Sequence, residues 1–71
     1  MNKAITDYTQ ALKINYEDAA TYYKRGITYY KQGKINKAIQ DFKKVTKLYS
    51  EQGDTVEQKL VLERLKQLQQ D

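Results

Sequence analysis

The sequence contains a repeat whose two copies begin 34 residues apart. Residues 2–8 read NKAITDY, and residues 36–42 read NKAIQDF. When residues 1–18 are laid over residues 35–52, seven of the eighteen positions are identical. A fixed period of this length is typical of stacked repeats, in which each unit buries its apolar face against the next one. We therefore expect the chain to fold as a stack of similar small units.

Within each copy, the apolar residues follow the period of an α-helix. In residues 35–49 they are separated by steps of three and four, which places them on one helical face. Residues 3–14 follow the same pattern, through Ala4, Ile5, Tyr8, Ala11 and Leu12. Between the two copies, residues 18–33 predict another helix, with Asp18 as its N-cap and Gly33 as its C-terminal stop.

Residues 53–71 predict a last and more polar helix. Gly53 supplies a turn, and Asp54 is the expected N-cap, with Glu57 three positions later to complete a pair resembling a capping box. The expected apolar stripe of this helix consists of Val56, Leu60, Val61, Leu62, Leu65 and Leu68. The chain is thus predicted to be all-α, with about four helices.

Length and composition exclude several classes of protein. With 71 residues the chain forms one domain at most, and a core of this size rarely supplies more than ~3–5 kcal/mol without further support. It contains neither Cys nor His, which removes thiolate catalysis, imidazole bases and the usual zinc and iron ligands. No apolar run approaches the ~18 residues of a membrane span, and no secretory signal is present. We therefore expect a cytoplasmic protein without membrane insertion, metal or cofactor.

The order of aromatic and small residues resembles the tetratricopeptide repeat. Tyr22, Gly26 and Tyr29 are followed by the turn KQGK and then by Ala38 and Phe42, in the 34-residue period of that family. The resemblance implies antiparallel helical hairpins stacked as a right-handed α-solenoid. It also implies a repeat core, which consists of Ala4, Tyr8, Tyr22, Gly26, Tyr29, Ala38, Phe42 and Val45. The chain departs from the family pattern at Arg25, where leucine is usual, at Tyr16 and Ser50, where proline is usual, and at Val45, which replaces alanine.

In this register, residues 1–71 form one domain of three segments. Residues 1–18 are the second helix of a partial repeat, residues 19–52 are a complete repeat, and residues 53–71 are a C-terminal capping helix, which solvates the end of the array. The first helix then lacks its hairpin partner. Either the chain is the C-terminal piece of a longer array, or it self-associates through that helix. We favour the longer array, because about three repeats are normally needed for stability.

Few side chains are suited to catalysis or to binding a phosphate or a metal ion. Gly33 and Lys34 lie too far from Gly26 to form a phosphate-binding loop. The carboxylates lie at helix starts, where capping and the helix dipole explain them better than a metal or hydrolytic site does. Ser50 is the only serine, and the sequence offers no usual base to activate it. We expect the protein not to be an enzyme.

Residues 24–47 form a basic block, in which Asp41 is the only acidic residue among eight cationic ones. Such a block could attract nucleic acid or an acidic peptide. A solvated helical face explains it better, because the lysines are spread over two helices and lack the aromatic interleaving of most nucleic-acid binders. Nucleic-acid binding is therefore the weaker alternative.

The resemblance also implies a binding groove, since the first helices of such hairpins line the concave surface of the solenoid and hold an extended or helical peptide. The residues that correspond here are Ala20, Tyr23, Ile27, Tyr30 and Lys31, continued by Glu57, Val61 and Arg64. Alternatively, the tyrosines merely cover the preceding helix. The carboxylate clamp of some family members is not reproduced, because Lys24 and Ile27 replace asparagines. We expect a non-catalytic scaffold that binds a protein or peptide, or alternatively a homo-oligomer that assembles through the first helix.

Overall fold

The computed structural model describes residues 3–69, which form four α-helices and, within that range, no strand. The helices are α1 (Lys3–Ile14), α2 (Ala19–Lys31), α3 (Ile35–Glu51) and α4 (Thr55–Gln69). Residues 1–2 and 70–71, which belong to the predicted first and last segments, lie outside the described residues. None of the four helices has the length and hydrophobicity that a membrane crossing requires.

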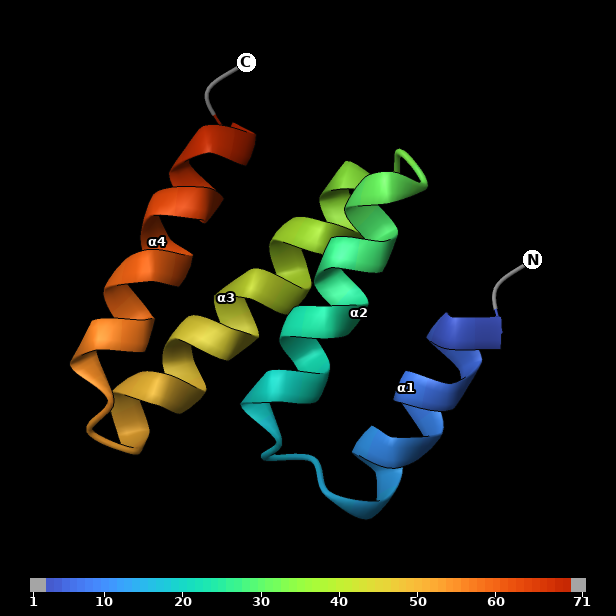
Figure 1. Ribbon diagram of the computed structural model, residues 1–71, viewed down its shortest axis with the longest axis horizontal. Helices are drawn as coiled ribbons and strands as arrows, with labels where there is room; N and C mark the ends of the chain where they lie inside the picture. Colours follow the sequence, from blue (N-terminus) through green and yellow to red (C-terminus); the bar gives the residue numbers. More distant parts are fainter. Residues whose placement is uncertain (1–2, 70–71) are drawn as a thin grey trace.

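The helices pack in chain order as antiparallel neighbours (Figure 1). Helix α2 contacts α1 on one side and α3 on the other, and α3 in turn contacts α4. The result is a flat molecule of 33 × 32 × 13 Å, with α1 and α4 at its opposite ends. The prediction of an all-α stack of helical hairpins is confirmed.

Local hydrogen bonds set the ends of the helices. Asp18 caps α2, since its carboxylate accepts hydrogen bonds from the backbone N–H of Thr21 at 3.3 Å and from the Thr21 hydroxyl at 2.8 Å. Gly33 ends the same helix at φ +80°, and the next N–H, of Lys34, donates to the Tyr29 carbonyl. The same arrangement recurs after α3 at Gly53, at φ +75°. The predicted turns are therefore formed by the residues that the sequence indicated.

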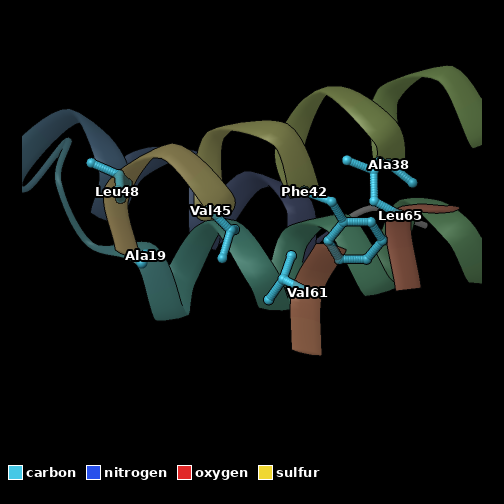
Figure 2. Packing of buried hydrophobic residues seen from close by; sticks show 7 residues of the cluster. All are labelled: Ala19, Ala38, Phe42, Val45, Leu48, Val61 and Leu65. Atoms are coloured by element: carbon cyan, nitrogen blue, oxygen red, sulfur yellow. The ribbon is translucent and has the colours of Figure 1, made fainter. Parts of the chain in front are cut away.

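Helix α3 supplies most of the core, because it is packed between α2 and α4. Figure 2 shows Phe42 and Val45 projecting from α3 towards these two helices. The buried apolar cluster consists of Ala19, Ala38, Phe42, Val45, Leu48, Val61 and Leu65. Gly26 allows α2 and α3 to approach, because a Cβ atom at this position would lie 2.9 Å from the Phe42 ring.

The predicted repeat core is placed unevenly. Gly26, Ala38, Phe42 and Val45 are buried, and the predicted tyrosines, Tyr8, Tyr22 and Tyr29, are half-buried. The assignment of Ala4 to the core is wrong, since this residue is exposed. Helix α1 contacts only α2 among the described helices, and Ala4 lies on the face of α1 that α2 does not cover.

The apolar stripe expected on the last helix is also only partly buried. Val61 and Leu65 face the core, whereas Val56, Leu60 and Leu62 are 69%, 56% and 40% exposed. Six apolar residues in this order cover more than one face of a helix, and α3 is the only described helix whose backbone lies close to that of α4.

Candidate functional site

A groove lies between α2 and α4 on the described surface, and we call it the α2–α4 groove. It consists of three adjoining hollows, of about 110, 320 and 100 Å³. The first and second share Arg64 and Gln67, and the second and third share Tyr23 and Leu60. The hollows therefore follow one another along the two helices, which run in the same direction (Figure 1).

One wall of the groove is a stripe of side chains on α2. Tyr23, Ile27 and Tyr30 follow one another at steps of four and three, the spacing of one helical face. The Tyr23 ring also packs against the buried Phe42, with ring centroids 5.5 Å apart and planes inclined by 50°. Tyr30 is 48% exposed. This wall is therefore anchored to the core at Tyr23 and open to solvent at Tyr30.

The opposite wall is a stripe on α4 with the same spacing. It consists of Leu60, Arg64 and Gln67, at steps of four and three. All three line the second hollow, and Arg64 and Gln67 also line the first. Asp54 holds the start of α4, because its carboxylate accepts a hydrogen bond of 3.2 Å from the backbone N–H of Glu57. The two walls thus present amphipathic and polar side chains to each other across an apolar floor.

The floor of the groove comes from α3. Phe42, which is 1% exposed, closes the first hollow, and Tyr49 lines the third. Burial and the negative charges of Glu57, Asp54 and Asp18 raise the pKa of the Tyr49 phenol above its ordinary value of 10.0. The Tyr49 phenol is therefore uncharged at neutral pH, as an unperturbed phenol also is.

Most of the groove residues expected from the sequence lie together. Tyr23, Ile27, Tyr30, Glu57, Val61 and Arg64 all line one of the three hollows, although Val61 is buried and contributes to the floor. Ala20 and Lys31 are exposed on α2 but line none of these hollows. Six further lining residues were not expected in the groove, namely Phe42, Tyr49, Leu60, Glu63, Gln67 and Leu68. The spacing of four and three that selected the α2 stripe would have found Leu60 and Gln67 on α4 as well.

A second polar cluster joins α1, α2 and α3 outside the groove. The Arg25 guanidinium donates two hydrogen bonds to the Asp41 carboxylate, at 2.8 and 2.7 Å, and one of 3.2 Å to the Thr9 hydroxyl. The guanidinium also lies 5.5 Å from the ring centroid of Tyr22 and 5.7 Å from that of Tyr29. The hydrogen bonds to Asp41 raise the pKa of Arg25, despite its partial burial. Arg25 is therefore held as a structural cation.

This cluster reduces the charge that the basic block offers to a ligand. Arg25 is neutralised by Asp41, and the ammonium groups of Lys37 and Lys44 lie 5.6 and 5.9 Å from the ring centroids of Tyr29 and Tyr22. The half-buried Tyr22 and Tyr29 rings are thus occupied by cations of the chain itself, and these rings are not free to stack on bases. This arrangement favours the solvated-face interpretation of residues 24–47.

Within residues 3–69, no set of three or more carboxylate, imidazole or thiol side chains is arranged to hold a metal ion.

Comparison with protein families gives two overlapping matches. A family model described as TPR repeat matches residues 1–33, and one described as tetratricopeptide repeat matches residues 19–52. Together they cover the chain up to the turn before α4. Searches among curated proteins and among solved structures gave no significant match.

Proposed function

Because the chain belongs to the tetratricopeptide repeat family, whose repeats generally mediate protein–protein interaction, we propose that it is a non-catalytic module that binds a peptide or partner protein in the α2–α4 groove. The observation that carries this proposal is the pair of facing stripes. Tyr23, Ile27 and Tyr30 on α2 oppose Leu60 and Arg64 on α4 along three adjoining hollows. The tetratricopeptide repeat family consists typically of non-catalytic interaction modules, which supports the proposal of a non-catalytic function.

The chemistry of the groove suits a peptide ligand. Tyrosine side chains offer a large apolar surface together with a hydroxyl group, and they lose little conformational entropy on binding. Tyr30, which is 48% exposed, lines the first hollow together with the buried Phe42 ring. An apolar side chain of a ligand could fill this hollow, while Arg64 and Gln67 bind polar groups of its backbone or side chains.

The test begins with ligands selected by the folded chain. Immobilised protein would be used to select binders from a displayed library of random dodecapeptides. The affinities of selected peptides would then be measured for the wild type and for Tyr30→Ala. Tyr30 is 48% exposed in the free chain, and removing a tyrosine that a ligand covers typically costs more than about 1 kcal/mol of binding free energy. We therefore expect the dissociation constant to rise by about fivefold to tenfold or more.

Tyr16→Ala is the matched control. Tyr16 is 67% exposed in the turn between α1 and α2, outside the three hollows. We expect this variant to bind the peptides like the wild type, and both variants to keep the helicity of the wild type in circular dichroism. Selected peptides that bind Tyr30→Ala and the wild type equally would exclude the groove as the binding site.

A second function, self-assembly through α1, is supported by a comparison of α1 with α3. At the period of 34 residues, Ala4 and Ala11 of α1 correspond to Ala38 and Val45 of α3, which are 0% exposed. Ala4 and Ala11 are exposed. Ile14, which corresponds to the buried Leu48, is 88% exposed. Helix α1 therefore presents to solvent a face that its counterpart buries completely.

A further inference from the structure

The charged side chains of the α2–α4 groove change sign along its length. The first hollow contains one charged residue, Arg64. The second contains Arg64 together with Glu63, and the third contains Glu57 alone. The groove is thus positive towards the C-terminal ends of α2 and α4, balanced in the middle, and negative towards their N-terminal ends.

Residues outside the hollows extend the same gradient. Lys31 ends α2 next to Tyr30, at the positive end. At the negative end, Asp18 and Asp54 begin the two helices. Burial and the charges of Glu57, Asp54 and Asp18 raise the pKa of Tyr49, which lines the third hollow together with Glu57.

The apolar part of the groove is also unequal at its two ends. The first hollow combines the Phe42 ring with Ile27 and Leu68, and it is small enough to be filled by one apolar side chain. The third hollow is lined by Tyr23, Tyr49 and Glu57 beside Leu60 and Val61, and it contains no cation. The positive end is therefore suited to an apolar side chain beside an anion, and the negative end to a cation.

On the basis of the proposed function, we infer that the groove binds peptides with a dipolar charge pattern. An acidic residue of the ligand pairs with Arg64 while its apolar neighbour fills the first hollow, and a basic residue pairs with Glu57. Charges arranged this way steer the ligand into one orientation and disfavour peptides of uniform charge.

The spacing of the two ligand charges follows from α4. Arg64 and Glu57 are seven residues apart in sequence, which is about 10 Å along a helix axis. An extended peptide covers this distance with roughly three residues. A helical peptide lying along the groove would need about seven, and random dodecapeptides are long enough for both cases.

The experiment is a parallel selection with charge-reversed proteins. The same library of displayed dodecapeptides would be selected on the wild type, on Arg64→Glu and on Glu57→Lys, and the enriched sequences would be compared. For the wild type we expect an acidic residue next to an apolar one, with a basic residue at a fixed separation. Arg64→Glu should exchange the acidic position for Lys or Arg, and Glu57→Lys should exchange the basic position for Asp or Glu.

Controls with the same change of net charge lie away from the groove. Lys47→Glu on α3 changes the net charge by the same amount as Arg64→Glu. Asp7→Lys on α1 does the same for Glu57→Lys. Both control residues are exposed. These variants should enrich the wild-type pattern. Peptides taken from the wild-type selection should lose at least about tenfold in affinity for Arg64→Glu, because a like charge replaces the pairing one.

The outcomes separate this inference from the function on which it rests. A wild-type chain that is helical but enriches no peptide would overturn both. Enriched peptides that depend on Tyr30 but carry no charge pattern, or the same pattern for all variants, would overturn the dipolar inference and leave groove binding in place. A pattern that follows the charges at positions 57 and 64 would establish it.

Discussion

At the scale of single residues, Asp41 is the most unusual position in the chain. It is the only charged residue buried among residues 3–69, at 5% exposure. Its two carboxylate oxygens accept hydrogen bonds from Arg25, which occupies a position where the family usually has leucine. The buried Asp41 is tolerated because the half-buried Arg25 compensates its charge, and the loss of Arg25 would leave the carboxylate desolvated without compensation.

We therefore expect Asp41→Asn to lower the free energy of unfolding by about 2 kcal/mol, a large part of what a domain of this size possesses. Urea denaturation followed by circular dichroism would measure it. Arg25→Met should lower the free energy of unfolding by a similar amount. The double variant should lose clearly less than the sum of the two single losses, because it leaves no unpaired charge. Strictly additive losses would indicate that the hydrogen-bonded pair is not the source of the effect.

At the scale of the helices, the α2–α3 hairpin depends on a close approach at Gly26. A Cβ atom there would lie 2.9 Å from Cε1 and 3.1 Å from Cδ1 of the buried Phe42 ring. Alanine is the better helix former by about 1 kcal/mol, but overpacking a rigid core typically costs about 1–3 kcal/mol. The steric cost should therefore exceed the gain in helix propensity.

For Gly26→Ala we predict a net loss of about 1 kcal/mol in the free energy of unfolding, again measured by urea denaturation. The contact with Phe42 can be isolated by repeating the substitution in a Phe42→Leu background, where the clashing ring atoms are absent. There Gly26→Ala should be neutral or stabilising. An equal loss in both backgrounds would mean that Phe42 does not set the distance between the helices.

The helices and their turns could be predicted from the sequence, but the contacts between helices could not. Periodicity and caps predicted the helices and their turns, because Asp18, Gly33 and Gly53 act through bonds to residues nearby in the chain. The buried face of α4 could not be predicted in the same way, since its six apolar residues allow several rotations. Which of them is buried depends on contacts with α3. The salt bridge between Arg25 and Asp41 joins α2 to α3, and the charges of these two residues alone did not predict that they would pair.

Part of the candidate groove was also expected from the sequence. The α2 stripe of Tyr23, Ile27 and Tyr30 followed from the family resemblance and from helical spacing, and these residues do share a groove wall. The role of Phe42 and Tyr49 as the groove floor depends on how α3 lies beneath α2 and α4, which sequence spacing does not give.

At the scale of the whole molecule, the two ends of the stack differ in what they expose. At one end of the stack, helix α4 exposes Val56 and Leu62 among charged residues. Helix α1 ends the other side with Ala4, Ala11 and Ile14, a stripe at steps of seven and three on one face. Small residues let a second helix approach closely, so α1 is the end better suited to pack against another helix. Because α1 and α4 lie at opposite ends, assembly through α1 would leave the α2–α4 groove open.

The last prediction tests assembly through α1. If copies of the chain associate through this helix, Ile14→Glu should weaken association by at least about tenfold, because a charge would be buried in an apolar contact. Ile14 is 88% exposed, so the fold of a single copy should be unaffected. Val56→Glu on α4, where Val56 is 69% exposed, introduces the same charge at the other end and should leave association unchanged. Sedimentation equilibrium over a wide concentration range would measure all three proteins. A wild type that stays monomeric throughout, or association that responds to Val56→Glu instead, would refute assembly through α1.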